Sequence, residues 1–178
     1  MLEKARKYII YFVLYSVIGW LYEVFLEVVV YKWGFSNRGF LTGPYCVIYG
    51  FASLIFIAAL YGLKKKKIKI GKVNITPFAV FLGIIVISTV IELLGSYVME
   101  LMTGSWAWDY TRFAFNFQGR IALNPSVRFG IGGMIFLYVF QPLFEKFTDA
   151  ISDKALAVIS NSLIALLAAD CVYTFLFQ

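Results

Sequence analysis

The sequence contains no histidine, so it lacks the side chain that most often exchanges protons near neutral pH and that most often ligates transition metals. Its only two cysteines, Cys46 and Cys171, lie far apart in apolar stretches, so it has no CxxC motif of a redox or zinc site. The glycine motifs GxxxxGK[ST] and GxGxxG, which bind phosphate groups, do not occur either. The sequence therefore predicts no metal and no cofactor, and it leaves any catalytic residue unidentified.

Charge is scarce as well. Charged residues make up 15% of the 178 residues, whereas 61% are hydrophobic and 19% are aromatic. A soluble domain of this length cannot bury so much apolar surface, so lipid must cover part of it. The net charge of +6 comes largely from one short run of lysines, which indicates membrane topology and not nucleic-acid binding.

Five apolar segments are long enough to cross a bilayer, which takes about 20 helical residues. They cover residues 8–30, 44–63, 77–102, 125–144 and 155–177. We therefore predict an all-α, polytopic membrane helical bundle of about five transmembrane helices, forming a single integral membrane domain over residues 1–178. Three of the segments start at a proline, Pro44, Pro77 or Pro125, which suits the first turn of a helix.

The basic residues predict the orientation of the bundle in the cell membrane. Eleven of the 16 lysines and arginines fall on the side of the N-terminus, among them the six lysines of residues 64–72, and five fall on the other side. Because basic loops stay in the cytoplasm, we expect a cytoplasmic N-terminus and, with five spans, an extracytoplasmic C-terminus. The aromatic loops 31–43 and 103–124 are then extracytoplasmic.

Two stretches of the chain look weakly alike. In residues 37–50 an Asn-Arg-Gly passage precedes a proline and a glycine, and residues 116–130 contain a similar passage before a proline and a glycine. The bundle could therefore be a two-fold internal repeat of helix pairs in the same orientation, as some transporters are. The alignment needs a gap, and apolar sequence aligns easily with itself, so the alternative of no repeat stays open.

Carboxylates recur at helical spacing inside three of the predicted spans. Glu23 and Glu27 share one face of the first, Glu92 and Glu100 share one face of the third, and Asp170 lies in the fifth. A carboxylate facing lipid costs about 2.5–3.5 kcal/mol even on the lenient insertion scale. These faces should therefore point inward, at a partner charge or at an outward-facing, water-filled cavity.

Two interpretations of these charges compete. In the first, ion pairs such as Glu23 with Arg38 or Glu92 with Arg120 only fix the packing of the helices. In the second, the charges bind a polar or zwitterionic ligand, because ionisable groups inside membranes usually mark binding sites and pathways. The candidate ligand-binding residues are Glu23, Arg38, Glu92, Asp109, Asn116 and Arg120. Trp108 and Tyr110 are either interfacial anchors or walls of the same pocket.

Several short motifs resemble a known family. They are Gly-Trp-Leu-Tyr-Glu at residues 19–23, Asn-Arg-Gly-Phe-Leu-Thr-Gly-Pro at residues 37–44, Ile-Tyr-Gly at residues 48–50, Trp-Asp-Tyr at residues 108–110, Asn116, and Gly-Arg-Ile at residues 119–121. Over nearly its whole length the chain is similar to the bacterial CmpB-like family of type IV ABC-transporter membrane proteins. The resemblance implies a transporter permease. Because the chain has no ATP-binding motif, a transport role implies a separate ATPase or coupling subunit.

These observations lead to one main functional hypothesis and one alternative. The main hypothesis is a small permease-like transporter component that binds a polar solute or a lipid headgroup in an outward-facing charged cavity. The alternative is a membrane-embedded enzyme that acts on a lipid or lipid-linked substrate with paired carboxylates, Glu23 with Glu92 or Asp109. Expected partners are membrane lipid, the coupling subunit and further copies of the chain, but no nucleic acid.

Overall fold

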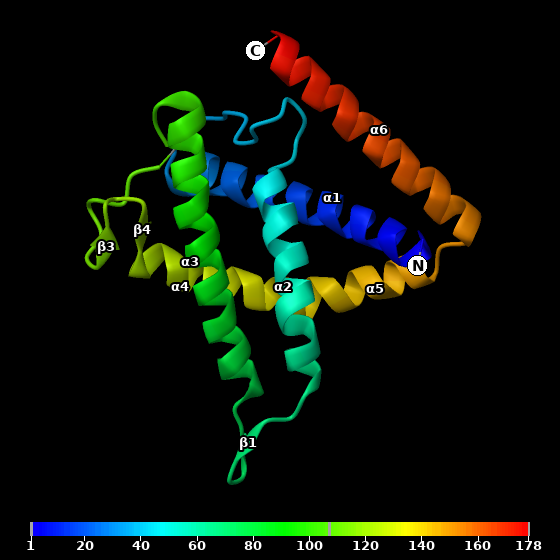
Figure 1. The fold of residues 1–178 in the computed structure, drawn as a ribbon, viewed down its shortest axis with the longest axis horizontal. Coiled ribbons are helices and arrows are strands. Elements are labelled where there is room, and N and C mark those ends of the chain that lie inside the picture. The colour runs from blue at the N-terminus through cyan, green and yellow to red at the C-terminus, as the bar shows by residue number, and fades with distance from the viewer. Residues whose placement is uncertain (1, 107, 178) are drawn as a thin grey trace. The chain divides into compact units, whose positions relative to one another are not determined.

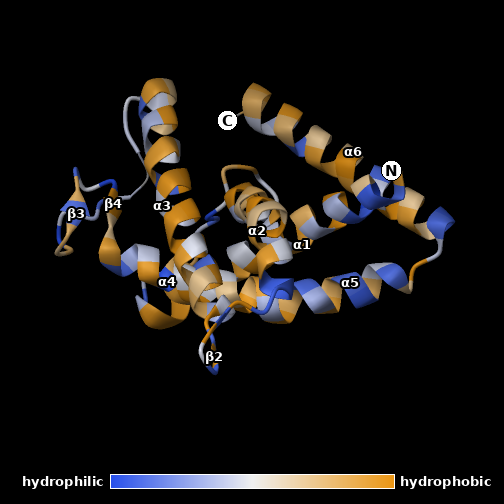
Figure 2. Ribbon diagram, turned by 60° about the horizontal axis from the view of Figure 1, so that its bottom comes forward, coloured by the Kyte–Doolittle hydropathy of each residue, from blue (hydrophilic) through white to orange (hydrophobic). Residues whose placement is uncertain are grey.

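The computed structural model of the protein describes residues 2–106 and 108–177 (Figure 1). In this part of the chain, five helices are long and apolar enough to cross a membrane. They are Leu2–Val30, Val47–Lys65, Thr76–Thr103, Leu123–Asp149 and Asp153–Phe177. Hydrophobic residues line these helices, and hydrophilic residues concentrate at the turns between them (Figure 2). The predicted all-α membrane bundle is confirmed.

Two of the five spans contain a π-helical turn. The first span consists of α1 (Leu2–Phe25) and the π-helix η1 (Leu26–Val30), and the fourth consists of α4 (Leu123–Ile135), the π-helix η2 (Phe136–Phe140) and α5 (Gln141–Asp149). The others are α2 (Val47–Lys65), α3 (Thr76–Thr103) and α6 (Asp153–Phe177). Two antiparallel hairpins complete the fold, β1 (Lys69–Ile70) with β2 (Val73–Asn74), and β3 (Asn116–Phe117) with β4 (Ile121–Ala122).

The described residues fall into two compact units. Residues 2–54 and 142–177 form unit 1, and residues 55–141 form unit 2. The chain passes from one unit to the other within α2 and again between Gln141 and Pro142. A single domain over residues 1–178 stays a prediction, as does the internal repeat of helix pairs.

Unit 1 is built on the first and last spans. α1 packs along α6, and residues of α5 cover the N-terminal half of α1. Tyr11 and Tyr15 of α1 are buried; the hydroxyl of Tyr11 lies 3.0 Å from that of Thr148, and the ring of Tyr15 meets Phe144 edge-on at 5.0 Å. Helix α1 begins at Leu2, six residues before the predicted start at Tyr8, because Glu3 and Lys7 form an ion pair one turn apart in its first turns.

Unit 2 is built on the close packing of α3 and α4, which glycines on α4 allow. A Cβ atom on Gly133 would lie 2.5 Å from Cγ2 of Ile84, and one on Gly130 would lie 2.7 Å from the ring of Phe81. Ile84 is fully buried at this contact. Gly132, in contrast, has nothing within 4 Å of its Cβ position, so the spacing of glycines alone does not identify the packed face.

Pro142 explains the π-helical turn η2. A proline inside a helix has no N–H to donate and crowds the carbonyl one turn earlier, and a π-turn relieves that crowding. Within η2 the N–H of Gln141 donates to the carbonyl of Phe136, five residues earlier. The carbonyl of Leu137 instead accepts from the ammonium of Lys64 at 2.7 Å. One lysine of the basic run therefore stabilises a helix as well as contributing positive charge.

Pro77 and Pro125 lie in the first turns of α3 and α4, but α2 begins three residues after Pro44. The segment before α2 stays outside the helix because its backbone N–H groups donate to other parts of unit 1. The N–H of Gly43 donates to the carboxylate of Asp170 at 2.9 Å, and the N–H of Cys46 donates to the carbonyl of Ser16 at 2.9 Å. These bonds fix the backbone of residues 43–46, and the helix begins only at Val47.

Candidate functional site

A tight turn between β3 and β4 positions Arg120 in unit 2. Its N–H donates to the carbonyl of Phe117 at 3.0 Å, and the turn between them uses left-handed backbone at Gln118 and Gly119. A Cβ atom on Gly119 would also lie 2.9 Å from the side chain of Thr111. The turn therefore requires glycine, and Arg120 leaves it in a fixed direction.

The guanidinium of Arg120 is buried among aromatic rings and helix α3. It lies 3.9 Å from the ring centre of Trp106 and 4.3 Å from that of Tyr97, in the range of a cation–π contact. It donates to the carboxylate of Glu100 at 2.5 Å and to the hydroxyl of Ser96 at 3.3 Å. Only 6% of Arg120 is exposed, so solvent screens this charge weakly.

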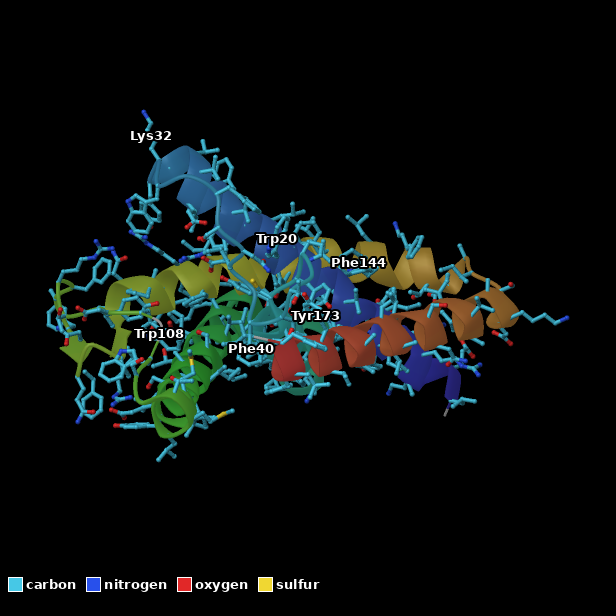
Figure 3. The ribbon with its side chains drawn as sticks, turned by 90° about the horizontal axis from the view of Figure 1, so that it is seen from above. Trp20, Lys32, Phe40, Trp108, Phe144 and Tyr173 are labelled. Carbon is cyan, nitrogen blue, oxygen red and sulfur yellow. The ribbon has the colours of Figure 1, made fainter. Side chains whose placement is uncertain are left out.

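Glu92 lies on the same face of α3, one turn before Ser96 and two turns before Glu100. It is 7% exposed, and one of its carboxylate oxygens accepts from the hydroxyl of Tyr110 at 2.9 Å. Trp108, labelled in Figure 3, donates its indole N–H to the carbonyl of Arg120 at 2.8 Å. The loop before β3 thus supplies hydrogen-bond donors to both the carboxylate of Glu92 and the backbone of Arg120.

We call Arg120, Glu92 and Trp106 the Arg120 cluster. Three of its buried polar atoms have no hydrogen-bond partner within unit 2. They are Oε2 of Glu92, Nε of Arg120 and Nε1 of Trp106. An unsatisfied buried polar group costs about 1–3 kcal/mol, and more when it is charged. The Arg120 cluster therefore has one hydrogen-bond acceptor and two hydrogen-bond donors without partners in unit 2, and one of the donors belongs to the stacked arginine itself.

Asp109 and Asn116 shape the loop that carries this cluster. Asp109 accepts from the N–H and the hydroxyl of Thr111, at 2.9 and 3.0 Å, and these bonds hold the pKa of its carboxyl below the usual range. The amide of Asn116 donates to the carbonyls of Thr111 and Phe113, and its oxygen accepts from the N–H of Gly119. Both side chains are exposed, and their contact with a ligand stays a prediction.

Glu23 and Arg38 lie in unit 1, where Arg38 pairs with a different carboxylate from the one expected. Its guanidinium lies 3.6 Å from Glu27, one turn beyond Glu23, and the same carboxylate accepts from the hydroxyl and the N–H of Ser36. In unit 2, likewise, Arg120 pairs with Glu100 and not with the deeper Glu92. In both units the arginine pairs with the carboxylate nearer the end of its helix.

The deeper carboxylates bind tyrosine hydroxyls. Glu23 accepts from Tyr49 of α2, whose ring packs against Gly19, and Glu92 accepts from Tyr110. Sequence reasoning missed Tyr49, although it follows Ile48 and precedes Gly50 in a quoted motif. The pairing of Glu23 with Glu92 stays a prediction, because the two carboxylates belong to different units.

Asp170, the carboxylate of α6, holds the loop that follows η1. It accepts from the N–H groups of Thr42 and Gly43, at 3.2 and 2.9 Å, and from the hydroxyl of Tyr45. Burial and this bond to Asp170 raise the pKa of Tyr45. The sequence analysis listed Asp170 among the carboxylates of the spans, but it did not identify Thr42, Gly43 or Tyr45 as hydrogen-bond partners. Among the described residues, no group of three or more acidic or cysteine side chains could hold a metal ion.

The five apolar helices and the charges within them define a multi-pass membrane protein. A family model described as "Putative ABC-transporter type IV" matches residues 10–175, and the chain belongs to this family. A search of curated proteins and a search of solved structures gave no match.

Proposed function

We propose that this protein is the membrane component of a transporter and that it binds a polar solute or lipid headgroup at the Arg120 cluster. The observation that carries the proposal is the set of unpartnered atoms on Glu92, Arg120 and Trp106. Two donors and one acceptor suit a ligand with an anionic or carbonyl oxygen at one position and an N–H or O–H group at another.

In the proposed orientation the cluster lies on the extracytoplasmic side of the membrane. With the N-terminus in the cytoplasm, the loop before β3 is extracytoplasmic, and Arg120 lies where that loop returns to the membrane. The family implies energy coupling by ATP, for which the chain has no binding motif, so a separate ATPase or coupling subunit is the expected partner. Glu23 and Arg38 belong to the proposed ligand-binding set as well.

Native mass spectrometry of the protein purified from its own membrane tests the proposal. The wild type should carry a small co-purified molecule, and Arg120→Lys and Glu92→Gln should each reduce its occupancy at least tenfold. Lysine keeps the charge but loses the planar fork and the stacking. Arg112→Lys is the matched control, because Arg112 lies in the same loop, is exposed and has its guanidinium over the ring of Phe113.

Thermal melting in detergent separates binding from folding. Arg120→Lys should remain folded, and Arg38→Lys should lose the molecule as Arg120→Lys does. If Arg120→Lys and Glu92→Gln retain the bound molecule, the cluster is only an ion pair that stabilises the fold. If Arg38→Lys alone retains it, unit 1 does not contribute to the site.

A further inference from the structure

Helix α6 packs along α1 through one side and leaves the other side uncovered within unit 1 (Figure 1). The buried residues of α6 are Leu156, Ser160 and Thr174, which share one side of the helix. Asn161 and Ala165 lie on the opposite side, and both are exposed. We call the exposed residues at four-residue spacing on this side, Asn161, Ala165 and Ala169, the small face of α6.

The small face differs from a helix side that contacts lipid. Along α3 the exposed residues at four-residue spacing are large and apolar: Phe78, Leu82, Val86, Val90 and Leu94. Acyl chains solvate such side chains well, whereas small side chains let another helix approach closely. Ile164 and Leu166, which flank the small face of α6, are large and exposed like the residues of α3. The small face therefore indicates contact with another helix.

Asn161 adds a polar group to this face inside the membrane. It lies eight residues after the start of α6 at Asp153, about 12 Å along the axis of a helix about 38 Å long. Among the described residues, none forms a hydrogen bond with its side chain. An amide that faces hydrocarbon has no water to bond, so its free energy falls when a neighbouring helix supplies a donor and an acceptor.

We propose that the small face of α6 binds the same face of a second copy of this chain, giving a dimer with its two-fold axis along the membrane normal. All copies have one orientation in the membrane, so this axis brings each residue of α6 to its own counterpart at the same depth. An asparagine amide both donates and accepts, so Asn161 and Asn161 of the partner subunit can form reciprocal hydrogen bonds. A second copy supplies this complementary group by symmetry, whereas any other helix would need a matching polar residue at that depth.

Ala165 and Ala169 set the distance between the two helices. Helices that pack through small residues at four-residue spacing approach closely and cross at about 40°, so they diverge on either side of the contact. The contact is then confined to the middle of α6, and the charged residues Asp153 and Lys154 at its start stay apart from their counterparts. The dimer involves no residue of the Arg120 cluster, so it stands or falls separately from the proposed function.

Disulfide crosslinking in native membranes tests the dimer. The background is Cys46→Ala with Cys171→Ala, and one cysteine is introduced on α6. On mild oxidation Ala165→Cys should form an intermolecular disulfide, because a two-fold contact at this position brings the two Cα atoms within the range that a disulfide needs. Leu166→Cys is the matched control, because position 166 is also exposed but points about 100° away around the helix, and its yield should be at least tenfold lower.

The dimer affinity in detergent gives a second measurement that needs no cysteine. Asn161→Ala should weaken the dimer about tenfold, measured by native mass spectrometry across a dilution series, because the interhelical hydrogen bonds are lost. Ala165→Leu should weaken the dimer further, because the larger side chain keeps the two helices apart. Both side chains are exposed, so each variant should keep the helical content of the wild type.

Three results would overturn the proposal. They are equal disulfide yields at positions 165 and 166, a dimer affinity of Asn161→Ala equal to that of the wild type, and a monomer both in detergent and in native membranes. A monomer whose position 165 is also protected from a membrane-permeant thiol reagent would identify unit 2 as the partner of the small face.

Discussion

Arg38 and Arg120 follow an asparagine in similar passages of the chain, yet their environments differ. The side chain of Arg38 is 41% exposed and lies 3.6 Å from its carboxylate, whereas that of Arg120 is 7% exposed and stacked on two rings. Their carboxylate partners differ in the opposite sense, because the side chain of Glu27 is 9% exposed and that of Glu100 is 40% exposed. Each pair therefore joins one buried and one exposed group, and the stacking on aromatic rings is what distinguishes Arg120.

Cys46 gives a pH-dependent prediction at the residue scale. It precedes α2 and is 4% exposed, and burial, with a smaller contribution from Glu23, raises the pKa of its thiol to about 11. The thiolate is the nucleophile, so the folded protein should react with iodoacetamide slowly at pH 8 and progressively faster as the pH rises toward 11. The measurement uses Cys171→Ala, in which Cys46 is the only thiol.

Unfolding in dodecyl sulfate supplies the control for Cys46. The pKa should then return to about 8.5, and the reaction at pH 8 should accelerate strongly. Complete labelling of the folded protein at pH 8 would contradict the shielding of this thiol.

The carboxylates of the site were predictable from the sequence, whereas most of their partners were not. The three-to-four-residue spacing of Glu92, Ser96 and Glu100 places them on one helix face whatever surrounds them. Which arginine reaches which carboxylate depends on the path of a loop, and no periodicity encodes that path. The bonds from Tyr49 to Glu23 and from Tyr45 to Asp170 join residues 26 and 125 positions apart, so local patterns could not reveal them.

At the scale of elements, all five spans were predictable because about 20 apolar residues have few alternatives to a membrane helix. The residues at which the spans begin and end were less predictable. Helix α2 begins later than predicted because tertiary hydrogen bonds hold residues 42–46 outside the helix, and the paired charges Glu3 and Lys7 extend α1 toward the N-terminus. Pro142 is a sequence signal for the π-helical turn η2, but no sequence signal indicates the hydrogen bond from Lys64 to the carbonyl of Leu137.

Two neighbouring glycines of α4 provide a matched prediction. Gly133→Ala should lower the melting temperature in detergent by several degrees, because the new Cβ would lie 2.5 Å from Ile84. Gly132→Ala meets nothing within 4 Å and should hold or raise the melting temperature, since alanine favours a helix by up to about 1 kcal/mol over glycine. Equal effects of the two substitutions would show that α3 and α4 do not pack as described.

For the whole molecule, the orientation in the membrane is the main prediction. In a variant with Cys46→Ala and Cys171→Ala, a cysteine at Lys66 should be protected from an impermeant thiol reagent added outside, and one at Arg112 should be labelled. Both positions are exposed, so burial cannot explain a difference. The opposite pattern would reverse the orientation and place the Arg120 cluster on the cytoplasmic side.

The packing of α1 along α6 also has a consequence for biogenesis. A membrane protein is inserted from its N-terminus as it is translated, so α1 enters the bilayer four spans before its packing partner exists. Unit 2 comes from one continuous stretch and can assemble as soon as α4 is inserted, but unit 1 must wait for α6. Until then the insertion machinery or water at the interface must shield the acidic face of α1 from lipid. The insertion of α6 thus sets the moment at which α1 gains its packing partner.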